Sequence, residues 1–280
     1  MPFARRPGAR IWWEESGAGD PVLLIMGHAY GADMWYRTAP ELAVSYRVIR
    51  FDNRGAGHSS DPPGPYPVPL LADDALAVLD AAGVASAHVY GVSLGGAIAL
   101  QLTLDHPGRV RSLVLGCTAA AAEGASRSAL SARVRTLLPA PVLNRMAARL
   151  LYGPDTPISL RAEDQQIVRS TRSTGRGRYG QVTGLAGFDV TGRLAEIRVP
   201  TLVMHGALDR VVPAANAQRL ADGIAGARLV MFPRAGHAYL TDAAQAANQE
   251  VLRFLGALPG PAGEPVSEPR DDRAVGPGTQ

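Results

Sequence analysis

Apolar and polar positions alternate along this 280-residue chain in two rhythms. Short, continuous apolar runs such as 22–26 are typical of strands buried on both faces of a sheet, whereas 70–82 has one apolar helix face. We expect strands at 10–15, 22–26, 46–51, 88–90, 110–115, 200–204 and 228–232. We expect helices at 33–42, 70–82, 95–104, 215–221 and 242–255. Their alternation predicts an α/β fold, with a doubly wound, mostly parallel sheet and helices on both faces.

The alternation stops between residues 119 and 192, where helical segments rich in Ala and Arg occur without convincing strands. Ligands bind at the carboxyl edge of such sheets, so we expect 119–192 to be a helical cap over that edge. The α/β core then comprises 1–118 and 193–258. Residues 259–280 are rich in Pro, Gly and charge, which predicts a disordered tail.

A Gly-x-Ser-x-Gly sequence, from Gly91 through Ser93 to Gly95, lies between an expected strand and an expected helix. A serine on a tight strand-to-helix turn has a strained backbone, and flanking glycines let the strand and the helix approach closely. Its hydroxyl then projects at the helix N-terminus, where free N–H groups favour a developing negative charge. The alternative is an ordinary Gly/Ser turn. Candidate catalytic partners of Ser93 later in the chain argue against this alternative.

Two such partners follow in the order Ser93, Asp209, His237. A serine is a weak nucleophile at neutral pH and needs a base together with a group that orients this base. Each of the three residues comes just after an expected strand, so we expect them at the same edge of the sheet. His205 lies at the end of the preceding strand and is interpreted as a packed histidine.

The charge and the cysteine content limit the range of other functions that this chain could have. The net charge is +3, and the 28 basic residues are all arginines scattered along the chain, which does not favour a nucleic-acid partner. The single cysteine, Cys117, excludes an internal disulfide and is expected to be a buried thiol. No spacing of His, Cys, Asp and Glu indicates a metal site. No apolar run approaches about 18 residues and none follows Arg5-Arg6, so we expect no membrane span, no secretory signal and a cytoplasmic protein.

Several stretches together resemble the α/β-hydrolase family, in the cap-bearing branch near enol-lactonases, carboxylesterases and cofactor-free haloperoxidases. They are the turn at Ser93, the Asp-x-Arg-Gly-x-Gly-x-Ser loop at 52–59, the strand and loop at 200–209, and Gly236-His237. The resemblance spans about residues 10–256 and is weak in the cap. It implies the α/β-hydrolase fold with a cap inserted after the sixth strand, and a serine hydrolase without a cofactor.

The resemblance also implies a role for each matching residue. Ser93 would be the nucleophile, His237 the general base, and Asp209 the group that fixes the imidazole tautomer. The backbone N–H groups of Leu94 and His28 would form an oxyanion hole. Dehalogenases and epoxide hydrolases of this fold use Asp where this chain has Ser93, so their chemistries are not expected.

The loop after the early strand departs from the family, which usually has His-Gly-x where this chain has Met26-Gly27-His28. The His28 side chain either touches the substrate or is an exposed loop histidine. Nearby, Tyr30 and Trp35 either line the substrate pocket or pack in the core.

Two further features, a polar loop and a cluster of glycines, are interpreted as structural or as mobile parts of the chain. The family's loop containing Asp52 and Arg54 is structural, so we expect no catalytic role for either. The glycines between 175 and 187 suggest a mobile hinge or a loop over the pocket mouth.

Three functions fit these observations, and in each of them the partner is a small molecule. The first is hydrolysis of a small to medium carboxylic ester or lactone through an acyl-enzyme. The second is an elimination, lyase or cyclase step on a natural-product intermediate, which the atypical loop at 26–28 suggests. The third is ligand binding with a residual triad. Ten arginines against five carboxylates in 119–192 indicate either an acidic substrate or solvated helix faces.

Overall fold

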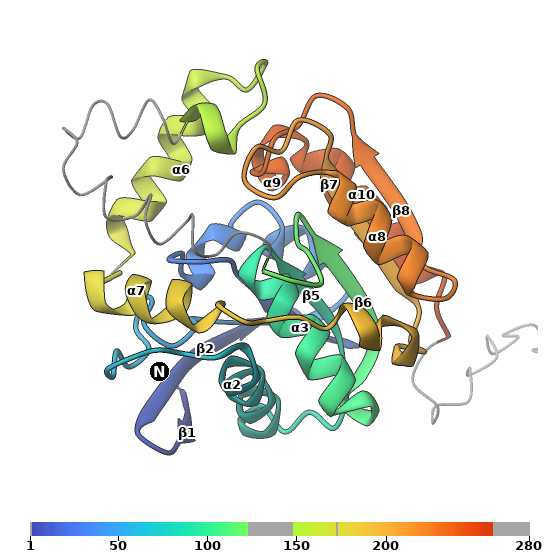
Figure 1. Cartoon of the computed structure of the whole chain (residues 1–280). Helices are drawn as coiled ribbons and strands as arrows, with labels where there is room; N and C mark the ends of the chain where they lie inside the picture. The colour runs from blue at the N-terminus through green and yellow to red at the C-terminus, as the bar shows by residue number, and fades with distance from the viewer. Residues whose placement is uncertain (1, 123–147, 172, 260–280) are drawn as a thin grey trace, which may run out of the picture.

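Within residues 2–122, 148–171 and 173–259, which the computed structural model describes, eight strands form one sheet (Figure 1). Their order is β1-β2-β4-β3-β5-β6-β7-β8. β2 pairs antiparallel with β1 and with β4, and every other neighbouring pair is parallel. The predicted α/β fold with a mostly parallel sheet is confirmed.

The element bounds follow the predicted pattern closely. The strands are β1 (Phe3–Arg6), β2 (Ala9–Ser16), β3 (Pro21–Ile25), β4 (Arg47–Phe51), β5 (Ala87–Val92), β6 (Val110–Gly116), β7 (Thr201–Gly206) and β8 (Arg228–Phe232). The helices are η1 (Ala32–Trp35), α1 (Ala39–Leu42), α2 (Val68–Ala81), α3 (Leu94–Asp105), η2 (Pro107–Arg109), α6 (Ile158–Ser170), α7 (Gly175–Gly184), η3 (Thr191–Glu196), α8 (Ala215–Gly223), α9 (Tyr239–Asp242) and α10 (Ala244–Gly256).

Helices cover both faces of the sheet because its central strands are apolar on both. Every residue of β5 and β7 is buried. Along β3, Leu23 and Ile25 belong to one hydrophobic core with α2, α3 and α8, whereas Val22 and Leu24 belong to a second core with α1 and α10. Successive side chains of a strand point to opposite faces, so one five-residue strand supplies both cores.

The structure corrects two local predictions. The expected helix at 33–42 is divided into η1 and α1, because Pro40 lacks the N–H that a continuous helix would use and its ring would clash with the preceding turn. The strand β1 was not predicted, since a four-residue run with two terminal arginines carries little periodic signal. With β1 counted, Val110–Gly116 is the sixth strand, as the resemblance implies.

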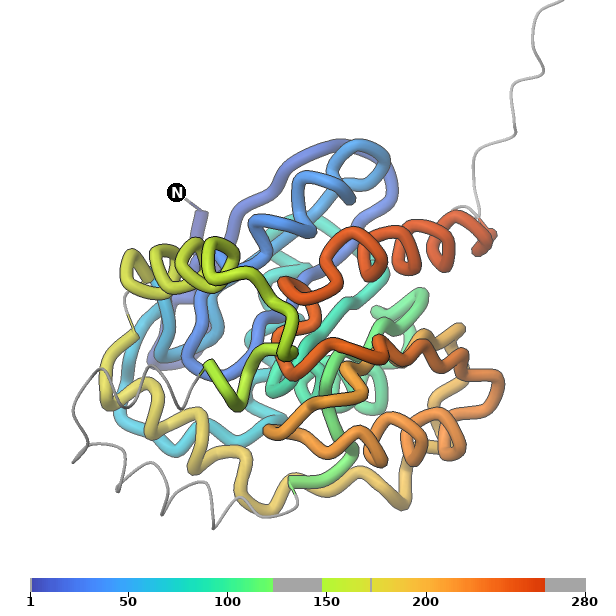
Figure 2. Tube along the Cα trace, turned by 90° about the horizontal axis from the view of Figure 1, so that it is seen from above, coloured from blue at the N-terminus to red at the C-terminus, as the bar shows by residue number. Residues whose placement is uncertain are grey.

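The segment between β6 and β7 contains α6, α7 and η3. Figures 1 and 2 show α6 and α7 on the opposite side of the molecule from α8. α6 contacts η1. Part of the predicted cap, 123–147, and nearly all of the predicted tail, 260–280, lie outside the described residues.

No helix in the described ranges is both long and apolar enough to cross a membrane.

Candidate active site

Ser93 lies on the turn that joins β5 to α3. Its backbone angles are φ 54° and ψ −120°, a conformation that non-glycine residues rarely adopt. A β-carbon on Gly91 would collide with the carbonyl of Gly95, and one on Gly95 would collide with the carbonyl of Ile25. The glycines at 91 and 95 are therefore required by close backbone packing, as the sequence predicts.

The end of β6 holds this turn in place. The Ser93 N–H donates to the carbonyl of Gly116 at 2.8 Å, and the Thr118 hydroxyl donates to the carbonyl of Ser93 at 2.7 Å. Both contacts fix the backbone and leave the Ser93 hydroxyl available.

The structure brings Ser93, His237 and Asp209 together. The Ser93 Oγ lies 3.1 Å from Nε2 of His237, and Nδ1 of His237 lies 2.7 Å from Oδ2 of Asp209. The three residues follow β5, β8 and β7, whose carboxyl ends share one edge of the sheet. With Nδ1–H donated to the carboxylate, Nε2 can accept the serine proton, which is the arrangement that activates a hydroxyl for attack.

The carboxylate of Asp209 is buried and accepts several donors. Oδ1 accepts the backbone N–H groups of Val211 at 2.8 Å and Val212 at 2.9 Å, and Oδ2 lies 3.2 Å from Nε2 of His205. Burial raises the pKa of Asp209, but the hydrogen bonds from His205 and His237 lower it by more, so this pKa lies well below its usual range. Asp209 is therefore a permanent negative charge beside His237 near neutral pH.

Two groups oppose the effect of burial on His237. Burial lowers the pKa of His237, whereas the sulfur of Cys117 and the carboxylate of Asp209 raise it, to about 10. Cys117 is buried, as the sequence predicts, and it also lies beside the imidazole.

Strained backbone gathers at this site. Among the described residues, the non-glycine residues with positive φ are Ala29 (68°), Ser93 (54°) and Cys117 (39°). Ala29 follows the predicted oxyanion donor, and Cys117 contributes to the environment of His237. Such strain persists where surrounding contacts impose it, and it is concentrated at functional sites.

The loop predicted to supply an oxyanion donor lies against Ser93. A β-carbon on Gly27 would be 3.2 Å from the Ser93 β-carbon. Leu94 is the first residue of α3, so its N–H has no partner within the helix. The His28 ring donates its Nε2–H to the backbone carbonyl of Arg178 at 3.0 Å, so the imidazole is anchored to α7.

The two aromatic residues near this loop differ in burial. Trp35 has no exposed surface and packs against Tyr90 with a ring-centroid distance of 4.8 Å. The prediction that Trp35 lines the substrate pocket is therefore replaced by its alternative, core packing. Tyr30 is partly buried and packs at the border of the same core, and its pocket role stays a prediction.

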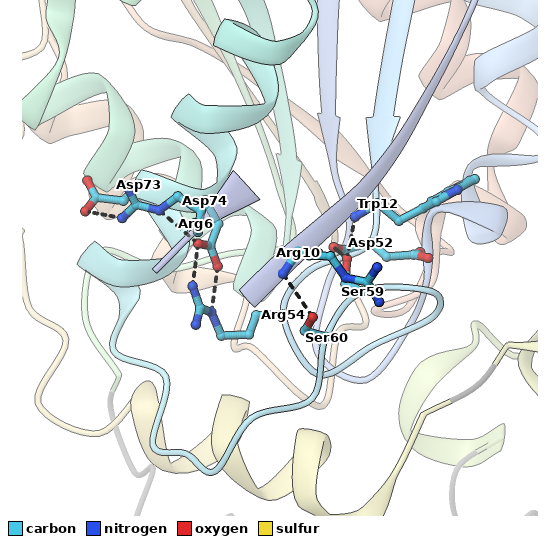
Figure 3. A network of polar contacts seen from close by, with 9 residues as sticks. All are labelled: Arg6, Arg10, Trp12, Asp52, Arg54, Ser59, Ser60, Asp73 and Asp74. Carbon is cyan, nitrogen blue, oxygen red and sulfur yellow. Dashed lines mark hydrogen bonds and ion pairs between the residues drawn. The ribbon is translucent and has the colours of Figure 1, made fainter. Parts of the chain in front are cut away.

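The Asp52 loop has the structural role that the family implies (Figure 3). Arg54 makes a buried bidentate ion pair with Asp74, with N···O distances of 2.7 and 2.8 Å, and Arg6 joins the same carboxylate. Asp52 accepts the backbone N–H groups of Ala32 and His58, each at 2.7 Å. These contacts tie the loop to η1, α2 and β1.

The glycines of α7 form a packing face, where the sequence suggested a hinge. Gly177 lies against the backbone of Gly55, and Gly180 and Gly184 lie against Tyr66. A β-carbon at any of the three helical positions would collide with this loop, so their spacing of three and four residues lets α7 seat directly on it.

Sequence reasoning missed polar residues that contact the triad or the loop at His28 without belonging to the triad. His205 shares the Asp209 carboxylate, and Gln181 bonds to the loop at His28, as described below. Asp242 accepts the backbone N–H groups of Gly236 and Gly153, each at 2.7 Å, next to His237. The four-residue spacing from His205 to Asp209 was one available signal. The described residues contain no group of three or more His, Cys, Asp or Glu side chains that could hold a metal ion.

Comparison with known proteins gives a consistent result. The family described as alpha/beta hydrolase fold has a sequence model that matches residues 20–244. The chain is 35% identical over 264 residues to a putative carbamate hydrolase RutD of Azorhizobium caulinodans, covering 92% of this chain and 99% of that protein. It is 34% identical over 247 residues to a 2-hydroxymuconate semialdehyde hydrolase of a Pseudomonas species, covering 82% and 84%.

A solved structure agrees with these relatives. The enol-lactonase of Burkholderia xenovorans superposes with a TM-score of 0.83 and is 27% identical, covering 91% of this chain and all of that one, a share of 100%. The chain belongs to the α/β-hydrolase family of enzymes.

Proposed function

We propose that the chain is a serine hydrolase that cleaves a small to medium carboxylic ester or lactone through an acyl-enzyme. One observation carries the proposal: the hydrogen-bonded series from Ser93 through His237 to Asp209, at 3.1 and 2.7 Å. The enol-lactonase among the solved structures supports this substrate class.

In the first half-reaction, Ser93 Oγ bonds to the substrate carbonyl carbon while its proton moves to Nε2 of His237. The carbonyl oxygen becomes negatively charged and accepts hydrogen bonds from the N–H groups of His28 and Leu94. Each of these hydrogen bonds lowers the barrier by about 3 kcal/mol. The carbon–oxygen bond to the alcohol then breaks, and Nε2–H of His237 protonates the leaving oxygen. In a lactone, that oxygen remains attached to the acyl group.

In the second half-reaction, water attacks the acyl carbon as His237 takes one of its protons. The carboxylic acid leaves, and Ser93 recovers its proton from His237. Throughout, Asp209 stays ionised, keeps the imidazole oriented and stabilises its protonated form.

The test is a chain-length series of p-nitrophenyl esters on the wild type and on Ser93→Ala, with a fluorophosphonate label read by intact mass. Turnover and one label at Ser93 in the wild type, with neither in the variant, is the expected result. Activity that survives in Ser93→Ala contradicts the proposal. A label at Ser93 without turnover of any ester favours the elimination, lyase or cyclase alternative.

The putative carbamate hydrolase named above favours a second candidate, hydrolysis of a carbamate. The same attack by Ser93 would then give a carbamoyl-enzyme, which deacylates slowly when its nitrogen lone pair stabilises the carbonyl. An N-unsubstituted aryl carbamate separates the two candidates. Continuous turnover favours the carbamate, whereas a single burst beside rapid ester turnover favours the ester.

A further inference from the structure

The side chain of Gln181, in α7, is fully buried and uses both ends of its amide. Its Oε1 accepts the N–H of Ala29 at 2.8 Å, and its Nε2 donates to the carbonyl of Arg54 at 2.9 Å. One partner only donates and the other only accepts, so the orientation of the amide is fixed. Gln181 thus joins the loop after β3 to the loop after β4.

The bond to Ala29 falls at a sensitive point of the first loop. Ala29 has a φ of 68°, which an alanine holds only when its surroundings impose it. The residue before it is His28, the proposed oxyanion donor, and the residue before that, Gly27, touches Ser93. A rotation at Ala29 would therefore turn the adjoining peptide planes relative to the Ser93 hydroxyl.

A second contact holds the other end of this loop. The Asn53 amide donates to the carbonyl of Met26 at 2.7 Å, from the same loop that contains Arg54. The loop at 26–29, called the oxyanion loop below, is therefore fixed at Met26 by Asn53 of the α/β core. It is fixed at Ala29 by Gln181, which belongs to the segment between β6 and β7.

Helix α7 is itself firmly seated. Its glycine face packs on Gly55 and Tyr66, and the Tyr66 N–H donates to the carbonyl of Gly180 at 2.8 Å. The carbonyl of Arg178 accepts from the His28 ring. α7 thus contacts the oxyanion loop through the Gln181 side chain and the Arg178 carbonyl.

We propose that Gln181 is a positioning residue for the oxyanion hole, so that the segment between β6 and β7 helps to set the geometry of the catalytic centre. This inference rests on the proposed function. Without the Gln181 amide, the N–H of Ala29 loses its buried acceptor and the strained φ loses its restraint. The loop then relaxes, and the His28 N–H no longer points at the developing oxyanion.

The first variant is Gln181→Met, which keeps the length and most of the volume of the side chain and removes both polar ends. We expect kcat for a p-nitrophenyl ester to fall about 10- to 100-fold, less than the roughly 10²–10³-fold that removal of a whole donor causes. KM should change less than about 3-fold, since the interaction acts in the transition state. The matched control is Gln101→Met, because the buried Gln101 amide donates to Asp105 within its own helix.

The preference for an ester over its thionoester gives a readout that a loss of stability would not move. An oxyanion hole stabilises negative oxygen better than the larger, weaker acceptor sulfur, so this preference should fall in Gln181→Met and persist in Gln101→Met. An unchanged preference with unchanged kcat in Gln181→Met overturns the inference.

A second variant, Gln181→Glu, tests the same contacts should the methionine variant fold poorly. The protonated carboxylic acid can accept from Ala29 and donate to Arg54, as the amide does, whereas the carboxylate cannot donate. We expect kcat relative to the wild type to recover as the pH falls. A ratio that does not vary with pH contradicts the inference. If the wild type neither labels at Ser93 nor turns over, the proposed function itself fails, which is a different outcome.

Discussion

Two buried aspartates, Asp52 and Asp209, occupy similar places in this fold. Each follows a parallel strand, β4 or β7, and each accepts two backbone N–H groups. Each also lies beside Nδ1 of a histidine: His58 at 3.2 Å from Asp52, and His237 at 2.7 Å from Asp209.

The two sites differ in electrostatics. For Asp52, burial raises the pKa more than its hydrogen bonds lower it, so the net shift is upward. For Asp209, burial also raises the pKa, but two histidines, His205 and His237, lower it below the ordinary value. Asp209 therefore has two imidazoles beside it, whereas the histidine beside Asp52 is His58.

They also differ in what the histidine faces. The Nε2 of His237 lies against the Ser93 hydroxyl, whereas the His58 ring packs on Trp12 and its side chain is half-exposed. An Asp–His pair at the edge of a sheet is thus not sufficient for a catalytic assignment. The assignment also requires the Ser93 hydroxyl at Nε2 of His237 and the ionised Asp209 at its Nδ1.

The largest effect is expected for Asp209→Asn. In a Ser-His-Asp site this change leaves the geometry in place but favours the wrong imidazole tautomer, and kcat falls about 10⁴-fold. Steady-state kinetics on a p-nitrophenyl ester measure it. A loss of less than about 10-fold would mean that Asp209 does not orient the base.

The matched change, Asp52→Asn, should act on stability. The new amide places an NH₂ where the carboxylate accepts a buried backbone N–H, and leaving that donor unsatisfied costs about 1–3 kcal/mol. We expect urea unfolding at lower denaturant and a kcat within about 10-fold of the wild type. A loss of kcat as large as in Asp209→Asn would remove the distinction between the two sites.

His205→Phe should give a smaller effect, because it removes an N–H that Asp209 shares with the carbonyl of Val212, at 3.2 and 3.0 Å, and leaves His237 in place. A hydrogen bond to a charged group contributes about 1.5–3 kcal/mol, so the pKa of Asp209 should rise and kcat fall about 10-fold. His205→Gln, which can place an N–H near the same position, is the control. Equal kcat in the Phe, Gln and wild-type proteins would exclude a role for His205.

The last prediction concerns pH. A pKa raised to about 10 keeps His237 protonated as the pH rises, so the neutral base, and with it kcat/KM, should increase with pH well above 6.5. The same shift stabilises the fold fully at low pH and fades as the pH approaches 10. Cys117→Ser removes the sulfur beside the imidazole, which raises the pKa of His237, and should move the midpoint of the rate profile downward. A midpoint at or below 6.5 in both proteins would contradict this assignment.

Local pattern was sufficient for much of the fold and of the site. Continuous apolar runs identified the buried strands, and Gly91 and Gly95 identified the turn at Ser93, because these signals lie within a few residues. The order of Ser93, Asp209 and His237 after successive strands placed them at one edge of the sheet.

Features that depend on contacts between distant segments were harder to predict. Gly177 and Gly180 suggested mobility, since their partners on the 55–66 loop are more than 100 residues away in the sequence. Gln181 gave no signal because its two partners lie 152 and 127 residues before it. His205 was recognised as packed, but its contact with Asp209 depends on how the loop after β7 turns.

The most direct test of the account is to trap the acyl-enzyme. Wild-type protein is mixed with an excess of a p-nitrophenyl ester that has a bulky, slowly hydrolysed acyl group, quenched in acid during turnover, and read by intact and peptide mass. The account predicts one added acyl group, on the peptide that contains Ser93, and none on Ser93→Ala. Turnover without acyl mass, or acyl mass on another residue, would contradict it.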